Sequence, residues 1–181
     1  QVDDDNAENL AVQPVFQQKY KTSLNVEFGP INEKIIEQLR TLNLSIFPVR
    51  YNDKFYAEVL SSGNFTKLAY YSTDILVGAI CCRLEKKGES SSLYIMTLGV
   101  LAPYRSCGIG TKLLTTTIEE ADEDSSIEEI YLHVQTSNTD ALDFYKRFGF
   151  EQREKICNYY KRIDPPDCFV MARRCSGAKN S

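Results

Sequence analysis

The segment from Leu98 to Leu113 constrains the fold more than any other, because it joins an apolar strand to an amphipathic helix through a turn with two glycines, Gly108 and Gly110. Glycine lets the backbone turn its N–H groups toward a ligand, and the start of a helix adds unpaired donors and the positive end of the helix dipole. Arg105 and Lys112 can add charge to these donors. The segment predicts a site for a phosphate-bearing ligand, although the same glycines would also ease a tight turn without one.

Other kinds of ligand site are excluded by spacing and charge. The turn lacks the Gly-Lys-Ser/Thr ending of a Walker loop, and Gly108-Ile-Gly110 lacks the third glycine of a dinucleotide-binding loop. A formal net charge of -4 gives no broad positive field, so direct contact with nucleic acid is not expected. No apolar run approaches the roughly 20 residues that span a bilayer, so no membrane partner is expected.

The six cysteines form no CxxC pair, and the chain has one histidine, so a metal site is not expected. Cys81 and Cys82 fall inside an apolar strand pattern, where free thiols behave as small buried hydrophobic residues. This cysteine usage favours a reducing compartment. We expect a cytoplasmic location, with the nucleus left open as a second one.

Periodicity along the chain predicts one domain over residues 24–175, between a flexible N-terminal extension at 1–23 and a C-terminal tail at 176–181. The order β-α-α-β-β-β-α-β-α-β-β predicts an α/β (α+β mixed) fold with a mixed, mostly antiparallel sheet and helices on both faces. Asp53 is expected to cap the second helix. The predicted elements are a strand at 26–28, helices at about 35–42 and 53–60, strands at 65–71, 75–85 and 92–100, a helix at 111–124, a strand at 129–135, a helix at 140–148, and strands at 150–158 and 167–174.

Arg105-x-x-Gly108-x-Gly110, after a strand and before a helix, resembles the acetyl-CoA loop of the GNAT superfamily of N-acetyltransferases, and the element order matches the GNAT fold. Four longer motifs, at 47–56, 94–105, 131–135 and 158–163, together resemble the NatE-type N-terminal acetyltransferases over about residues 25–175. Ser106-Cys107 departs from this pattern where the family carries a further basic residue. The resemblance implies acetyl-CoA as co-substrate and, as substrates, polypeptide N-termini that begin with Met followed by an apolar residue. It also implies the subunits of the NatA complex and the ribosome as partners.

The resemblance also implies where acetyl-CoA lies. Its pantetheine arm is expected where the strand of Leu98 and the strand of His133 separate. Gly99 inside an apolar strand suggests a β-bulge that frees a backbone N–H, which makes Leu98 the candidate oxyanion donor. Tyr145 resembles the residue beside the CoA thiolate, and helix core is its alternative role. The expected acetyl-CoA contacts are Leu98, Val100, Arg105, Ser106, Cys107, Gly108, Ile109, Gly110, Thr111, Asn138 and Tyr145.

Acetyl transfer from a thioester needs a neutral amine, donors for the carbonyl oxygen and a proton for the departing thiolate. Strand alternation puts His133 on one face with Tyr131 and Gln135, although a lone strand histidine is more often a packed or surface residue. The resemblance implies that Tyr94 and His133 together deprotonate the amine through an ordered water. It also implies that the acetyl group passes directly from acetyl-CoA to the amine.

Two aromatic loops, at 47–51 and 159–163, are interrupted by polar neighbours, which favours half-exposed loops that line a substrate slot over plain core. The resemblance assigns these loops to the first residues of the polypeptide, and Met96 offers soft contact to a methionine. Two alternatives stay open: a lysine N-ε-acetyltransferase, and a protein that is mainly a docking subunit of the NatA complex. The expected substrate contacts are Phe47, Pro48, Val49, Tyr51, Tyr94, Met96, Tyr159, Tyr160 and Ile163.

Overall fold

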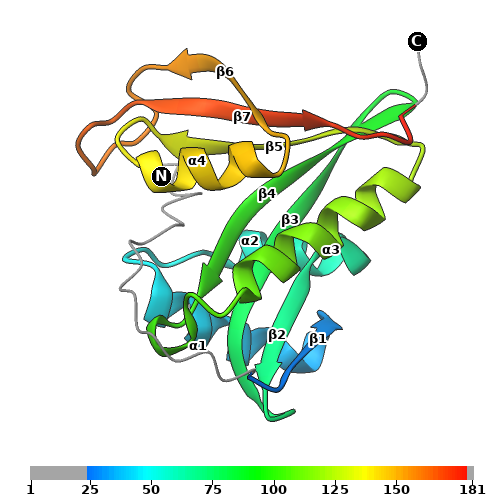
Figure 1. Ribbon diagram of the computed structural model, residues 1–181, viewed down its shortest axis with the longest axis vertical. Coiled ribbons are helices and arrows are strands. Elements are labelled where there is room, and N and C mark those ends of the chain that lie inside the picture. Colours follow the sequence, from blue (N-terminus) through cyan, green and yellow to red (C-terminus); the bar gives the residue numbers. More distant parts are fainter. Residues whose placement is uncertain (1–23, 179–181) are drawn as a thin grey trace.

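The computed structural model describes residues 24–178, which form a seven-stranded sheet with helices on both faces (Figure 1). The strand order is β1-β2-β3-β4-β5-β7-β6, and each neighbouring pair is antiparallel except β4 and β5. The predicted fold class is therefore confirmed, whereas the predicted extension at 1–23 and the end of the predicted tail, 179–181, lie outside the described residues. The elements are β1 (Val26–Pro30), η1 (Glu33–Ile35), α1 (Ile36–Ile46), α2 (Asp53–Ser61), η2 (Gly63–Phe65), β2 (Lys67–Tyr71), β3 (Ile75–Lys87), β4 (Ser90–Val100), η3 (Ala102–Tyr104), α3 (Ile109–Glu123), β5 (Ile127–Gln135), α4 (Thr139–Arg147), β6 (Glu151–Ile156) and β7 (Cys168–Arg174).

The sheet separates two apolar layers. The helices α3 and α4 cover one face, where Leu113 and Leu142 pack with Leu132 and Val134 of β5. The helices α1 and α2 cover the other face, where their apolar residues pack with Tyr94 and Met96 of β4, and Tyr131 of β5 packs against this second layer. Alternation along β4 and β5 therefore presents different side chains to the two layers.

Two sequence predictions about element ends need correction. The cap of α2 is Asn52, whose side chain accepts the N–H of Phe55, while Asp53 is the first helical residue and pairs with Arg40. The predicted strand at 65–71 starts at Lys67, because Gly63–Phe65 forms a 3-10 turn. Other ends differ by a few residues. Cys81 and Cys82 are buried free thiols, as predicted.

Strands β4 and β5 diverge along their length (Figure 1). Their parallel pairing runs from Ser91 opposite Ile127 to Tyr94 opposite Tyr131 and ends there. Within residues 24–178 no other strand lies between β4 and β5 in the sheet, so the sheet is open beyond this last pair.

The β-bulge in β4 lies at Met96, and the prediction of a bulge at Gly99 is wrong. Thr97 pairs with Cys81 but Ile95 pairs with Cys82, so Met96 is the extra residue. Gly99 instead makes room for the end of α1, since a Cβ there would lie 2.7 Å from Cζ of Phe47. The glycine signal therefore came from helix packing rather than from strand pairing.

No helix within residues 24–178 is both long and apolar enough to cross a bilayer.

Candidate active site

The backbone of β4 turns a donor toward the opening. Leu101 donates its N–H to the carbonyl of Val77 on β3 at 2.8 Å, and residues 97 to 101 keep an unbroken register with β3. Backbone N–H and C=O groups alternate in direction along a strand. Those of Leu98 and Val100 therefore point away from β3, toward the side on which β5 no longer pairs with β4. Arg105 reaches into that space and donates Nε–H to the carbonyl of Val100 at 2.9 Å. The N–H of Leu98 thus faces the opening, as predicted. Its direction follows from the regular alternation of the strand and not from a bulge at Gly99.

The turn before α3 provides a second group of donors. Gly108 occupies the N-cap position with φ of 78°, a left-handed conformation that glycine adopts without steric cost, and no side chain caps this helix. Ser106 also has a positive φ of 60°. An uncapped helix start leaves its first N–H groups available to an anion. The start of α3 therefore offers the backbone donors that the prediction of a phosphate site requires.

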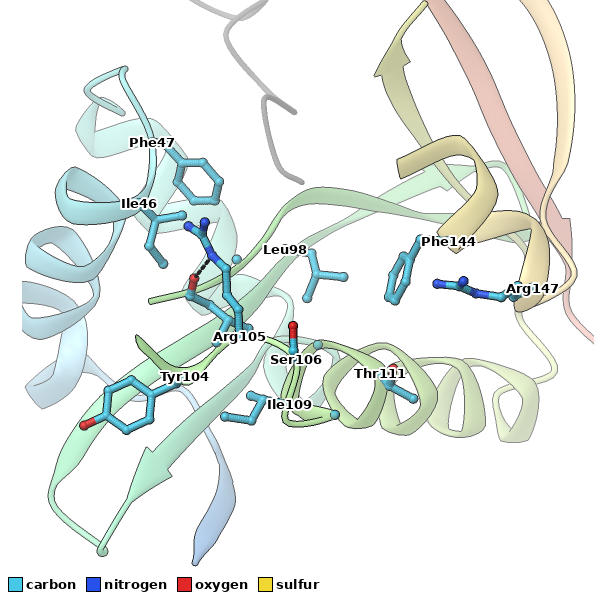
Figure 2. Close-up of a pocket in the computed structure, with 14 residues that line it drawn as sticks. Ile46, Phe47, Leu98, Tyr104, Arg105, Ser106, Ile109, Thr111, Phe144 and Arg147 are labelled. Atoms are coloured by element: carbon cyan, nitrogen blue, oxygen red, sulfur yellow. Dashed lines mark hydrogen bonds between the residues drawn. The ribbon is translucent and has the colours of Figure 1, made fainter. Parts of the chain in front are cut away.

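A pocket of about 260 Å³ joins these two groups of donors (Figure 2). Ile46 and Phe47 approach it from the end of α1, and Phe144 and Arg147 approach it from α4 on the opposite side. Most of the predicted acetyl-CoA contacts line this pocket, namely Leu98, Val100, Arg105, Ser106, Gly108, Ile109, Gly110 and Thr111.

Three predicted contacts lie outside the lining. The roles of all eleven residues stay predictions. Cys107 is exposed, and its thiol donates to the carbonyl of Arg105. Asn138 caps α4 by accepting the N–H of Ala141 at 3.2 Å. Tyr145 is buried beside the pocket residue Phe144, and its hydroxyl has no hydrogen-bond partner among the described residues.

Sequence reasoning missed five residues that line the pocket: Ile46, Gly99, Tyr104, Phe144 and Arg147. A signal existed for two of them, because Phe144 and Arg147 are three residues apart and share one face of α4. The guanidinium of Arg147 lies 5.7 Å from the ring centroid of Phe144. Together they give the α4 side of the pocket an aromatic surface and a cation.

The predicted catalytic pair is in direct contact on the α1 and α2 side of the sheet. The phenol oxygen of Tyr94 lies 2.8 Å from Nδ1 of His133, without a water between these two atoms. Burial lowers the pKa of His133 to about 4. The imidazole is therefore neutral at neutral pH and can accept a proton.

Tyr159 adds a contact that sequence reasoning missed. Its phenol oxygen lies 3.2 Å from the same Nδ1 of His133, and the two rings stack with centroids 4.5 Å apart. Tyr159 belongs to the segment between β6 and β7, so the aromatic loop at 159–163 touches the histidine through a side chain. The resemblance assigned only a substrate role to this residue, and no motif links it to His133.

The two aromatic loops meet next to this group. Burial raises the pKa of Tyr160, and Cys168, Tyr159 and Tyr51, in that order, add smaller contributions, so Tyr51 and Tyr160 lie near each other. The interpretation of half-exposed loops is wrong for Phe47 and Tyr160, which are 5% and 4% exposed. Met96 is fully buried, and Pro48 is exposed. Val49, Tyr51 and Ile163 are half-buried, as predicted.

No group of three His, Cys, Asp or Glu side chains within residues 24–178 could hold a metal ion. The described chemistry is that of an anion-binding backbone, a neutral histidine and phenols.

The chain matches the Acetyltransferase (GNAT) family over residues 36–150. It is 52% identical over 148 residues to N-alpha-acetyltransferase 50 of Danio rerio, which covers 82% of this chain and 88% of that protein. It is 47% identical over 152 residues to the probable N-acetyltransferase san of Drosophila melanogaster, which covers 84% and 82%. Among solved structures, it resembles Arabidopsis thaliana Naa50 in complex with the bisubstrate analogue CoA-Ac-MVNAL, with a TM-score of 0.78 and 53% identity over 83% of this chain and 99% of that one.

Proposed function

The chain belongs to the GNAT family of acetyltransferases and is an N-alpha-acetyltransferase that uses acetyl-CoA, and from this premise we propose that its acceptors are polypeptides beginning with Met followed by an apolar residue. The observation that carries the proposal is the contact of Tyr94 and Tyr159 with His133 at the opening between β4 and β5. The analogue bound by the Arabidopsis protein carries the sequence MVNAL, which begins with Met and Val.

The donor pocket fits a phosphate-bearing thioester. Acetyl-CoA supplies an activated acetyl group, and the uncapped start of α3 offers N–H groups to its pyrophosphate. The N–H of Leu98 then donates to the thioester oxygen as negative charge develops on it. The hydroxyl of Tyr145, which has no hydrogen-bond partner within residues 24–178, supplies a donor for the departing thiolate.

The acceptor amine loses its proton on the other side of the opening. An α-amine has a pKa of about 8, so part of it is neutral near pH 7. His133 is neutral at that pH, and together with Tyr94 it receives the remaining proton through a water as the C–N bond forms. A weak base is enough, because nitrogen becomes more acidic as it bonds to the carbonyl carbon.

Direct transfer to the amine is favoured over a cysteine-bound intermediate. The central sheet carries Cys81 and Cys82, and burial raises the pKa of both, that of Cys81 to about 12. A buried protonated thiol is a poor nucleophile. The acetyl group therefore passes from sulfur to nitrogen in one displacement through a tetrahedral intermediate.

The acceptor loops favour a chain end over a side chain on a folded surface. Phe47, Val49 and Tyr51 on one loop and Tyr159 and Tyr160 on the other form apolar and aromatic walls, and Met96 lies beneath them in the same layer. An extended N-terminus with an apolar first side chain can enter between such walls, whereas an internal lysine brings its own chain on both sides.

The test compares acceptors. We would measure kcat/KM for a Met-Leu peptide, a Ser-Leu peptide of otherwise equal sequence, and an N-terminally blocked peptide with an internal lysine. The proposal predicts the Met-Leu peptide as best substrate by at least about tenfold, the scale of one well-used apolar side chain. A preference for the lysine peptide would overturn it, and acetyl-CoA binding without turnover of any peptide would favour a docking subunit.

Partners and location follow from the resemblance alone. We propose docking on the subunits of the NatA complex at the ribosome, and a cytoplasmic location with the nucleus left open. Copurification of the tagged chain with NatA subunits, before and after ribosome removal, tests the first, and imaging of the same tagged chain tests the second.

A further inference from the structure

Three side chains form a row across the sheet at the point where it opens. Arg83 of β3 pairs with Tyr94 of β4, and Tyr94 pairs with Tyr131 of β5. The pair Tyr94 and Tyr131 is the last one before the strands separate. Beyond it, no strand ladder fixes the distance between the β4 and β5 sides of the active site. Side-chain contacts in this row must then set that geometry.

The row is packed ring against ring and cation against ring. The guanidinium of Arg83 lies 4.9 Å from the ring centroid of Tyr94, and the rings of Tyr94 and Tyr131 are 4.8 Å apart. Tyr131 also approaches the ring of His133 at 6.1 Å, edge to face. Tyr131 therefore contacts both members of the catalytic pair with its ring and leaves its hydroxyl for another partner.

That partner is Glu85, two residues beyond Arg83 on β3. Tyr131 donates its hydroxyl to Oε1 of Glu85 at 2.6 Å, and Nη2 of Arg83 lies 3.4 Å from the same oxygen. The other side of the guanidinium pairs with Glu58 of α2 at 3.2 Å. These groups are half-buried, and their hydrogen bonds close a loop of contacts from β5 through β3 to the ring of Tyr94. Burial and the bond to Glu85 both raise the pKa of Tyr131, so its hydroxyl keeps the proton that it donates.

We propose that Glu85 and Tyr131 are positioning residues for the acetyl transfer: through Arg83 and the packed rings they hold the Tyr94 phenol against His133 where β4 and β5 separate. This inference rests on the proposed roles of Tyr94 and His133. It assigns no proton transfer to Glu85 or Tyr131, because their hydrogen bond connects to each other and not to Nδ1 of His133.

The central experiment removes one oxygen and leaves the ring. Tyr131→Phe should lower kcat for a Met-Leu peptide about tenfold, since a small misplacement of a catalytic group costs a large part of its contribution. The KM for acetyl-CoA should stay within twofold, because neither Tyr131 nor Glu85 lines the donor pocket. Tyr56→Phe is the matched control, since it also deletes a phenol oxygen that bonds one side chain, here Asn43, in a more buried position, and it should leave kcat unchanged.

A double-mutant cycle separates positioning from general stability. In a Tyr94→Phe background, where the hydroxyl to be positioned is gone, Tyr131→Phe should cost less than twofold in single-turnover rate. Equal losses in both backgrounds, or wild-type kcat in Tyr131→Phe alone, would overturn the inference.

Glu85 gives an independent arm that does not depend on how Tyr131→Phe folds. Glu85→Gln keeps an oxygen that can accept from Tyr131, so it should retain more activity than Glu85→Ala at equal acetyl-CoA affinity. Equal activity of the two variants would contradict the inference. Failure of the proposed function would look different, because the wild-type chain itself would then not acetylate the peptide.

Discussion

The donor side and the acceptor side of this active site are built in different ways. The donor side is mostly backbone: the N–H of Leu98, the turn at Ser106 and Gly108, and the uncapped start of α3, all within one continuous stretch of chain. The acceptor side consists of side chains that the fold brings together from Tyr51, Tyr94, His133 and Tyr159. The two sides meet where β4 and β5 separate.

This difference decides how each side responds to mutation. A backbone donor cannot be deleted by a side-chain substitution and is disturbed only where a residue forces the chain to move. A side-chain base is lost in one substitution. We therefore expect changes on the acceptor side to lower kcat with little effect on acetyl-CoA binding. Changes on the donor side should weaken acetyl-CoA binding with little effect on kcat at saturation.

The largest expected effect is that of His133→Ala. Loss of a general base should lower kcat about 100-fold for a Met-Leu peptide. Because the imidazole does not line the donor pocket, the Kd for acetyl-CoA measured by calorimetry should stay within twofold. A variant that keeps wild-type kcat would remove His133 from the mechanism, and one that loses acetyl-CoA binding would end the separation of the two sides.

The next effect in size is that of Gly108→Ala on the donor side. Gly108 has φ of 78° with no atom near its missing Cβ, so alanine would be strained by its backbone alone, by about 1–2 kcal/mol. The turn should relax and move its N–H groups, which raises the Kd for acetyl-CoA by about tenfold while kcat at saturation changes little.

Gly88 provides the matched control for this strain. It has φ of 64° with equally open surroundings, but it lies in the turn between β3 and β4, outside the pocket lining. Gly88→Ala should lose a similar amount of stability and keep the wild-type Kd for acetyl-CoA. Equal Kd changes in both variants would show that the effect is global.

The same contrast explains how much the sequence could predict. Eight of the eleven predicted acetyl-CoA contacts line the pocket, because strand, turn and helix follow one another along the chain and each has a local signal, whereas Phe144 and Arg147 come from a later helix. Element order and the faces of β5 were predicted for the same reason. The bulge was misplaced, because the glycine at position 99 is required by the close approach of Phe47. That residue lies 52 positions earlier and touches Gly99 only in the folded chain.

The acceptor side was predicted residue by residue but not contact by contact. The motif resemblance named Tyr94, His133 and Tyr159, yet no local pattern encodes the hydrogen-bond distance between Tyr159 and His133. The bond from Tyr131 to Glu85 joins positions 46 residues apart and has no motif at all. Side-chain contacts of this kind depend on strand register. Hydrophobic periodicity shows which face of the sheet a residue lies on, but it does not identify the residue opposite it on the next strand.

A smaller effect is expected from Tyr159→Phe. The ring that stacks on His133 remains, and only the hydroxyl 3.2 Å from Nδ1 is lost. Since Tyr94 still contacts the same nitrogen, kcat should fall by about two- to fivefold, the scale of one neutral hydrogen bond. Tyr159→Ala, which also removes the stacked ring, should fall further, and equal losses in the two variants would show that the hydroxyl alone matters.

The smallest expected effect is on stability against pH, and it separates the two sides without a change in the donor pocket. Burial lowers the pKa of His133 from 6.5 to about 4, so between these values the unfolded chain binds a proton that the folded chain does not. His133 therefore does not reduce the free energy of unfolding above about pH 6.5. Below this pH, protonation of the unfolded chain lowers the free energy of unfolding progressively until about pH 4. Relative to His133→Gln, which cannot titrate, the wild-type Tm should fall by on the order of 5 °C between pH 7 and pH 5. The Kd for acetyl-CoA should follow the same pH course in both proteins, because the donors of that side are backbone N–H groups, and a Tm difference that is flat with pH would mean that His133 is solvated like an ordinary histidine.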